Sequence, residues 1–242
     1  MHVTQADFSA RFPVATPSRV EQFIRQTSFD RPTLVLDIDA VETQYHALKA
    51  GLGRADIHFA VKANPAREII ERLVSLGAHP EHISFGNTVK RASDIAFAHH
   101  AGLTLFAADA EEELEKIAEN APGAQVYIRL IVEASGADWP LTRKFGTTRG
   151  KALHLLAMAR DLGLDPVGFS FHVGSQTRKP EMWSSTLDQV AAIWTDARDA
   201  GFDLSLINIG GGFPAFYGEE IAHPTTYAAA VMAQVEARFP GA

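Results

Sequence analysis

The chain has 242 residues, which is long enough for one barrel-sized domain or two small ones. Its formal net charge of −7, with lysines and arginines scattered along the chain, excludes a basic nucleic-acid-binding surface. The absence of cysteine excludes disulfides and thiolate metal sites. No apolar stretch is long enough to span a bilayer, and the N-terminal region lacks the apolar segment of a signal peptide. We therefore expect a cytoplasmic protein with neither a membrane nor a nucleic acid as partner.

The chain alternates between strand and helix patterns. A leader helix comes first, capped by Thr16 with Pro17 at its first position. Several of the strand candidates are near-continuous apolar runs, typical of parallel strands buried on both faces. The predicted strands are Thr33–Asp39, Ile57–Asn64, Ile83–Asn87, Leu103–Asp109, Gln125–Val132, Val167–Gly174 and Leu204–Gly212. The predicted helices are Arg67–Leu76, Ala110–Asn120 with Asp109 as its N-cap, Lys151–Leu162, Glu181–Ala200 and Tyr227–Phe239.

Seven strand–helix units without a break in composition predict an α/β fold. We divide the chain into a leader with a helix, residues 1–31, and one α/β domain, residues 32–242. Two architectures fit this domain, a (β/α) barrel and a doubly wound open sheet. A glycine-rich turn lies in the last unit rather than in the first, which favours the barrel.

Lys62 closes the apolar run that starts at Ile57. A lysine at the end of a buried strand either extends its ammonium to solvent or is held close to neutral. A near-neutral lysine is a nucleophile that can condense with an aldehyde. For a single lysine the solvent-exposed alternative is the commoner one. Polar residues also end the other predicted strands, and their presence favours the interpretation of Lys62 as a reactive lysine.

Three consecutive glycines, Gly210, Gly211 and Gly212, end the last predicted strand. Successive backbone N–H groups without side chains can form a concavity for phosphate oxygens, to which the Ser175 hydroxyl can add a donor. A tight turn that needs positive φ is an equally good explanation of the glycines. Neither the dinucleotide fingerprint nor a P-loop is present, which disfavours a nucleotide.

Two further residues lie near the same predicted strand ends. His172 can stack on an aromatic ring or be an ordinary core histidine. Arg129 lies inside a predicted strand, where an unpaired guanidinium would be costly. The histidines show no zinc-binding spacing, so we expect no metal site. A lysine, an imidazole, an arginine and a phosphate-binding turn together suggest pyridoxal 5′-phosphate.

Five motifs in this order resemble those of the ornithine/lysine/diaminopimelate decarboxylase family, and most of all those of its bacterial ornithine (or lysine/ornithine) members. The motifs are Phe59–Asn64, Ile83–Asn87, Leu141–Gly146, Phe171–Gln176 and Ile209–Pro214. The resemblance runs from about Pro32 to Pro240. It implies a TIM-type (β/α) barrel of the alanine-racemase-like fold that binds pyridoxal 5′-phosphate.

The resemblance also implies roles for individual residues. Lys62 would bind the cofactor aldehyde, His172 would stack on its ring, and Arg129 would lie beneath it. Ser175 and the backbone of Gly210, Gly211 and Gly212 would bind its phosphate. The implied reaction is decarboxylation of a basic amino acid, with L-ornithine giving putrescine for polyamine biosynthesis. The implied partners are this small-molecule substrate and a second copy in a homodimer.

The sequence departs from the family pattern in two regions. Residues 77–82 run directly from a helix into a strand where family members carry a further βα unit. Against the family pattern, the final barrel strand and the C-terminal β-domain are also missing. We therefore expect an incomplete barrel. Two alternatives stay open beside the decarboxylase: a stand-alone pyridoxal-phosphate-binding barrel without that activity, and an inactive remnant that pairs with a full-length decarboxylase.

Overall fold

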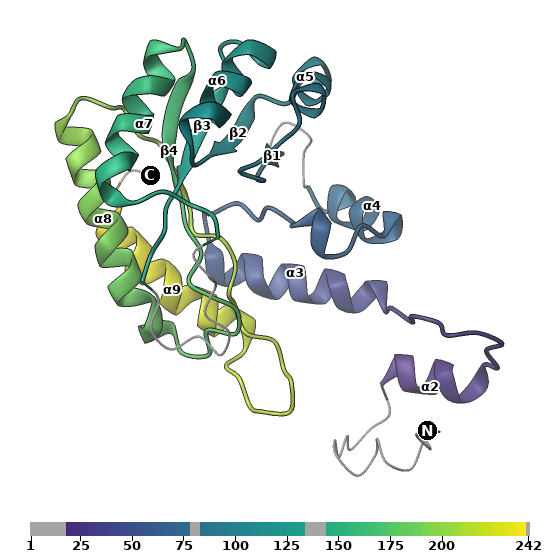
Figure 1. The fold of residues 1–242 in the computed structure, drawn as a ribbon. Coiled ribbons are helices and arrows are strands. Elements are labelled where there is room, and N and C mark those ends of the chain that lie inside the picture. The colour runs from purple at the N-terminus through teal and green to yellow at the C-terminus, as the bar shows by residue number, and fades with distance from the viewer. Residues whose placement is uncertain (1–17, 78–82, 134–143, 241–242) are drawn as a thin grey trace.

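Among the residues that the structure describes, five parallel strands form one sheet (Figure 1). The computed structural model describes residues 18–77, 83–133 and 144–240. The strands are β1 (Ser84–Phe85), β2 (Leu105–Ala108), β3 (Gln125–Arg129), β4 (Asp165–Ser170) and β5 (Leu206–Asn208). The helices are α2 (Arg19–Gln26), α3 (Ile38–Leu52), α4 (Arg67–Ser75), α5 (Ala92–His100), α6 (Glu111–Asn120), α7 (Arg149–Asp161), α8 (Ser184–Asp199) and α9 (Pro224–Arg238). Two short 3-10 helices, η1 (Val61–Ala63) and η3 (Pro180–Trp183), complete the described elements.

The order of the strands decides between the two predicted architectures. The strands follow one another in space as in sequence, β1-β2-β3-β4-β5, with every pair parallel. A doubly wound sheet reverses its strand order at a switch point, and this sheet does not. Right-handed crossovers in one direction place the connecting helices on one face. The domain is an α/β half-barrel, which confirms the predicted class and the expectation that the barrel is incomplete.

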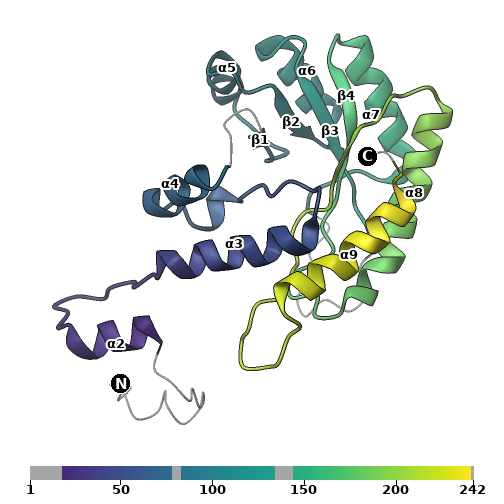
Figure 2. The same cartoon turned by 180° about the vertical axis from the view of Figure 1, so that it is seen from behind.

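The helix layer extends further around the molecule than the sheet does. Neighbouring helices contact each other from α5 through α6, α7 and α8 to α9. The layer then continues through a long contact of α9 with α3, and from α3 to α4 (Figure 2). The hydrophobic core fills the space between this layer and the sheet, with Phe106, Ile128 and Phe169 fully buried. The strands thus present their other face to the concave side of the half-barrel.

Two predicted strands are wrong. Residues 32–37 run without regular structure, Leu34 is 86% exposed, and α3 begins at Ile38. The helix starts there because the Asp37 carboxylate accepts the backbone N–H groups of Asp39 and Ala40 at 3.0 and 3.4 Å. Residues 57–60 are likewise irregular and lead into η1, so Ile57–Asn64 is not a strand either. Apolar runs of this length occur both in strands and in irregular segments. Such a run forms a strand only where a neighbouring strand pairs with it.

The predicted helix starts also need correction. Thr16 and Pro17 lie outside the described residues, and α2 begins after Ser18, which forms a capping box with Glu21. Asp109 does not cap α6, because its carboxylate accepts the N–H of Gly146 at 2.6 Å instead. Helix α8 begins at Ser184, later than predicted, since η3 takes up the preceding residues. The predicted helices Arg67–Leu76 and Lys151–Leu162 match α4 and α7 within two residues at each end.

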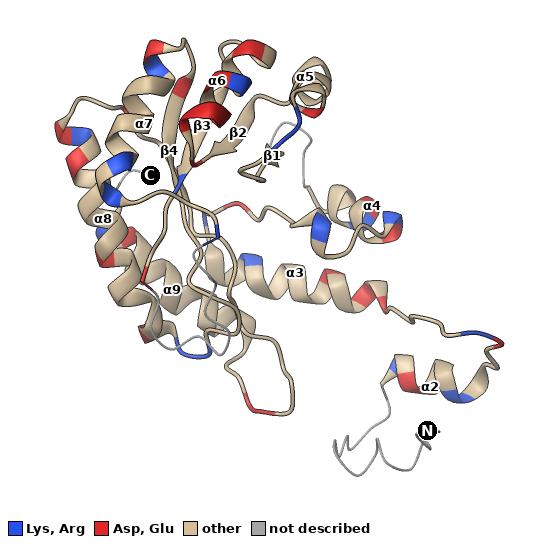
Figure 3. Cartoon of the chain, in the orientation of Figure 1, with Lys and Arg blue, Asp and Glu red and all other residues tan. Residues whose placement is uncertain are grey.

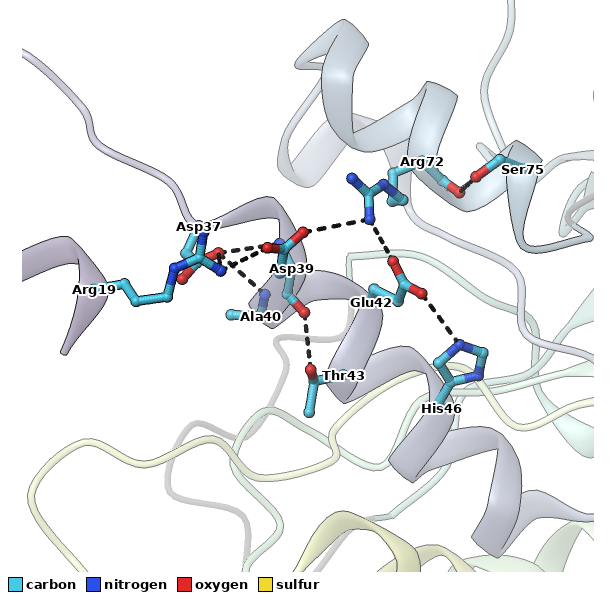
Figure 4. A network of polar contacts seen from close by, with 9 residues as sticks. All are labelled: Arg19, Asp37, Asp39, Ala40, Glu42, Thr43, His46, Arg72 and Ser75. Atoms are coloured by element: carbon cyan, nitrogen blue, oxygen red, sulfur yellow. Dashed lines mark hydrogen bonds and ion pairs between the residues drawn. The ribbon is translucent and has the colours of Figure 1, made fainter. Parts of the chain in front are cut away.

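Helix α2 lies outside the half-barrel and buries none of its residues. Its main polar link is a chain of charges, drawn in Figure 4. Arg19 bonds Asp39 at 2.6 Å, and Arg72 of α4 joins Asp39 at 3.5 Å and also bonds Glu42. The Arg19 hydrogen bond and charge lower the pKa of the Asp39 carboxyl. A hollow of about 470 Å³ between α2 and residues 35–39 contains none of the predicted site residues.

A buried lysine fixes the loop that follows β1. The Lys90 ammonium is fully buried and donates to the carbonyl oxygens of Asn87 and Ala107 at 2.8 and 2.6 Å. It also pairs with the Glu113 carboxylate of α6 at 2.8 Å. Burial lowers the pKa of Lys90, whereas Glu113 opposes that shift. One side chain thus joins the β1 loop, β2 and α6.

We predict that Lys90→Met destabilises the fold by about 3 kcal/mol, because it removes one partner of a buried ion pair. Urea unfolding measures this difference. The matched control is Lys151→Met on the exposed surface of α7, which should change the stability by less than about 0.5 kcal/mol. Equal effects of the two substitutions would show that Lys90 is not a structural link.

Candidate cofactor site

The site begins with one row of residues across the ends of three strands. The strand register places Arg129 of β3 beside Ser170 of β4, and Ser170 beside Asn208 of β5. Residues two apart along a strand lie on the same face, so the backbone leads from this row to His172 and Gly210. The carboxyl ends of β3, β4 and β5 therefore bring together residues that are up to 81 positions apart, from 129 to 210.

The glycine turn packs directly against the backbone that follows β4. Gly210 and Gly212 have φ values of 70° and 106°, in the region that favours glycine. A Cβ atom on Gly210 would overlap the carbonyl oxygen of Phe171, and one on Gly212 would overlap that of Gly174. A Cβ on Gly211 would lie 3.3 Å from the His172 Nε2 atom. The turn therefore does require glycines. The same geometry leaves the backbone N–H groups beside the His172 imidazole without a side chain that covers them.

Hydrogen bonds hold the turn in this position. The Gly210 N–H donates to the Asn208 Oδ1 atom at 2.9 Å, and the Gly212 carbonyl accepts the Thr177 N–H at 2.9 Å. Gln176 bonds Ala215 in both directions, at 2.8 and 2.7 Å. Since the Gly210 N–H is already bound to Asn208, Gly211 and Gly212 are the better candidates for phosphate binding within the predicted glycine set.

His172 is half-buried and faces the turn. Its Nδ1 atom accepts the N–H of Gly174 at 3.0 Å, which places the proton of the neutral ring on Nε2. Burial lowers the pKa of His172, and the positive charges of Arg129 and Lys62 lower it further. The imidazole is therefore held neutral by its surroundings.

Lys62 does not close a buried strand, so that part of the prediction is wrong. It lies in η1 and is exposed. Its charge nevertheless acts on His172, which places it on the side of the molecule that carries the glycine turn. The structure thus brings the predicted lysine, histidine and glycines to one end of the half-barrel, with the lysine in contact with solvent.

Arg129 and Ser175 are both half-buried. The Arg129 guanidinium lies over the ring of Phe145, 5.7 Å from its centroid. This cation–π contact partly offsets the cost of burying the charged group. Phe145 belongs to the motif Leu141–Gly146, of which Leu141, Thr142 and Arg143 lie outside the described residues. Ser175 directly follows Gly174, the residue against which Gly212 packs.

Two residues of the site were missed by sequence reasoning. Asn208 holds the glycine turn, and the Tyr127 hydroxyl lies in the concave interior, 3.4 Å from the Ser84 Oγ atom. Both lie within predicted strands, where their side chains carry no recognisable motif. Only the register of the sheet places Asn208 in one row with Ser170 and Arg129.

Charge and metal chemistry complete the description of the site. Lysines and arginines are interleaved with acidic residues over the outer helices (Figure 3). Among the residues that the structure describes, there is no cluster of three or more His, Asp or Glu side chains able to hold a metal ion. Within the same residues, no helix has the length and apolar character needed to cross a membrane.

The residues present fit a phosphorylated pyridine ring. The turn at Gly211 and Gly212 offers backbone N–H groups where any side chain would collide or crowd His172. The His172 imidazole lies against the turn, and the positive charges of Arg129 and Lys62 lower its pKa. Together, fold and site define a cofactor-binding half-barrel of the type used by pyridoxal-phosphate enzymes.

Comparison with known proteins agrees with this class. Residues 68–242 match the family model described as "Pyridoxal-dependent decarboxylase, pyridoxal binding domain". The chain belongs to this family, whose cofactor is pyridoxal phosphate. Lys62 precedes the matched residues.

Individual relatives show the same affiliation. A lysine/ornithine decarboxylase of Selenomonas ruminantium is 34% identical over 201 residues, covering 76% of this chain and 51% of that protein. Antizyme inhibitor 2 of Xenopus laevis is 30% identical over 210 residues, covering 79% of this chain and 46% of that protein. A crystal structure of lysine decarboxylase from Selenomonas ruminantium superposes with a TM-score of 0.83 at 30% identity, covering 93% of this chain and 64% of that one. The chain spans about half the length of the curated relatives it matches.

We predict that the imidazole of His172 titrates below 6.5, its ordinary value, and that Arg129→Met raises this midpoint by removing a nearby positive charge. Because the unfolded chain binds the proton more readily, stability should rise with pH between the folded midpoint and about 6.5. An NMR titration of the histidine ring measures both chains. Arg160→Met is the matched control, since Arg160 also stacks on a phenylalanine, Phe202, at 5.1 Å. An unchanged midpoint in Arg129→Met would contradict the electrostatic contact.

Proposed function

We propose that this chain is the cofactor-binding part of a pyridoxal-phosphate-dependent decarboxylase of basic amino acids, with L-ornithine as substrate and putrescine as product. The observation that carries the proposal is the glycine turn packed against a neutral His172, with Lys62 on the same side. Residues 32–242 would form the cofactor domain behind a leader of residues 1–31. Cytoplasmic location, a role in polyamine biosynthesis and assembly as a homodimer belong to the same proposal.

Each predicted site residue except Gly210 would have a part in holding the cofactor. The N–H groups of Gly211 and Gly212, with the Ser175 hydroxyl, would bind the phosphate. The Lys62 amine would hold the aldehyde carbon, and the neutral ring of His172 would lie against the pyridine. Bound pyridoxal phosphate supplies a ring that accepts the electron pair left by the departing carboxylate. Arg129 and Lys62 add positive charge on the side where an anionic phosphate and carboxylate would enter.

Lys62 gives the most direct test of cofactor binding. We expect the purified chain, mixed with pyridoxal phosphate, to show a new absorbance band that borohydride converts into a stable adduct on the peptide containing Lys62. Lys62→Ala should lose both the band and the adduct, because no other residue is proposed to hold the aldehyde. Absorbance and peptide mass mapping measure these two results.

The control for this experiment is Lys151→Ala, which removes an exposed lysine from the outer helix α7 and should leave the adduct unchanged. An adduct that persists in Lys62→Ala, or that spreads over many surface lysines, would show that Lys62 is not the cofactor lysine.

The relatives support a basic amino acid as substrate, since they include a lysine/ornithine decarboxylase. We expect carbon dioxide release from ornithine to exceed that from lysine by roughly ten- to a hundredfold, the discrimination typical of one extra methylene group. Release of ¹⁴CO₂ from carboxyl-labelled ornithine and lysine measures the ratio. A ratio near one, or a preference for lysine, would overturn the choice of ornithine.

The similarity to antizyme inhibitor 2 favours a second candidate function, because that relative is named as an inhibitor and not as a decarboxylase. In this alternative the chain binds a full-length decarboxylase of the family and lowers its activity. Cofactor binding without carbon dioxide release, together with co-elution with such an enzyme at micromolar concentration, would favour the second candidate over the first. Cofactor binding with neither release nor co-elution would leave a stand-alone pyridoxal-phosphate-binding barrel.

A further inference from the structure

Gln176 combines a buried side chain with an unfavourable backbone conformation. The residue is 8% exposed and directly follows Ser175, whose hydroxyl is a candidate donor to a phosphate. Its φ of 55° makes it the one non-glycine residue at positive φ in the part of the chain that the structure describes. A Cβ atom disfavours this left-handed conformation, which glycine adopts freely. The presence of a glutamine here indicates that its side chain makes contacts that offset the cost.

Those contacts are made with a single residue beyond the glycine turn. The Gln176 Nε2 atom donates to the Ala215 carbonyl oxygen at 2.8 Å, and the Gln176 Oε1 atom accepts the Ala215 N–H at 2.7 Å. One amide group thus binds both backbone groups of one residue, in the way that a neighbouring strand does. A carboxylate lacks the donor and an apolar side chain lacks both groups, so this pair of bonds requires an amide. We call the pair the Gln176 clamp.

Ala215 lies where the chain leaves the glycine turn. Residues 215–220 are exposed, and the loop that contains them projects from the half-barrel before α9 begins (Figure 1). Just before Ala215, the ring of Phe213 packs against the rings of Trp183 and Tyr227, with centroids 5.4 and 5.5 Å apart. The clamp therefore fixes the boundary between the packed part of this segment and the exposed loop.

The clamp is one of several contacts between two backbone segments, residues 174–177 and 211–215. Gly212 packs so closely against the first segment that a Cβ atom would overlap it, and its carbonyl accepts the Thr177 N–H at 2.9 Å. Ser175 belongs to the first segment, and the candidate phosphate-binding N–H groups belong to the second. The contacts between the segments thus set the spacing between the Ser175 hydroxyl and those N–H groups.

We propose that Gln176 is a positioning residue of the candidate cofactor site: by clamping Ala215, it holds the Ser175 hydroxyl and the N–H groups of the glycine turn at a spacing that fits one phosphate. The inference rests on the proposed function of this turn. In this role Gln176 does not touch the phosphate itself. It acts by joining the two segments that carry the donors, and its two bonds offset the cost of its left-handed backbone.

The test uses Gln176→Gly, which removes both bonds while glycine still accepts the positive φ. We expect the protection factor of the Thr177 amide against hydrogen exchange to fall in the ligand-free chain, because its bond to Gly212 lies beside the lost clamp. We also expect binding of pyridoxal phosphate to weaken by roughly tenfold, as for loss of one buried hydrogen bond, while binding of pyridoxal without the phosphate is unaffected. Hydrogen exchange followed by NMR and equilibrium titration measure the two effects.

Gln189→Ala is the matched control, because the Gln189 amide binds both backbone groups of Glu133 in the same way, at 3.0 and 3.1 Å, from the outer helix α8. It should change neither the protection of Thr177 nor the affinity for either ligand. Gln176→Asn is the second variant if Gln176→Gly does not fold. Asparagine tolerates the left-handed backbone, but its amide is one methylene too short for the clamp, so both effects should have the same direction.

Unchanged protection of Thr177, or unchanged affinity for pyridoxal phosphate, would overturn the inference, since glycine would then replace Gln176 without loss. So would an equal loss of affinity for pyridoxal phosphate and pyridoxal together with faster exchange throughout α9, because that pattern indicates general destabilisation. Failure of the unchanged chain to bind pyridoxal phosphate would instead contradict the proposed function. The exchange measurement, which needs no ligand, would then decide whether Gln176 holds the two segments together.

Discussion

The candidate site depends on the close approach of two backbone segments, residues 171–174 and 210–212. Their carbonyl and Cα atoms come so near that a side chain at Gly210 or Gly212 would overlap the facing chain. This approach has two consequences for chemistry. It sets His172 directly against Gly211, and it leaves an array of backbone N–H groups whose direction is fixed by Asn208 and Thr177. A small displacement of either segment would separate the imidazole from the turn.

The electrostatic character of the site differs from that of the whole chain. The protein carries a formal net charge of −7, yet His172 lies under the influence of two cations, Arg129 and Lys62. These charges disfavour the imidazolium and favour an anion in the same space. The arrangement suits a ligand with a phosphate and a carboxylate. It also explains how one end of an acidic protein can attract such a ligand while the outer helices remain mixed in charge (Figure 3).

Sequence reasoning located the five strands that have parallel neighbours and the glycines that the turn requires. It failed at Thr33–Asp39 and Ile57–Asn64, because strand formation depends on a pairing partner that a local apolar pattern does not reveal. Lys62 was identified by its residue type and place in a motif, while its exposure follows from the missing strand. The place of Asn208 at the site was beyond reach for a different reason. It lies far from Arg129 in the sequence, and only the register of β3, β4 and β5 brings the two residues into one row.

The contact between α3 and α9 bears on how the chain acquires its fold. Thr225 at the start of α9 donates its hydroxyl to the carbonyl of Ala47 in α3 at 2.8 Å, across 178 residues, and Gly51 has no space for a side chain against this helix. Such distant contacts are formed late and make folding slow. During synthesis the apolar side of α3 stays uncovered until residues 224–238 have left the ribosome, so the newly made protein is exposed to aggregation over this interval.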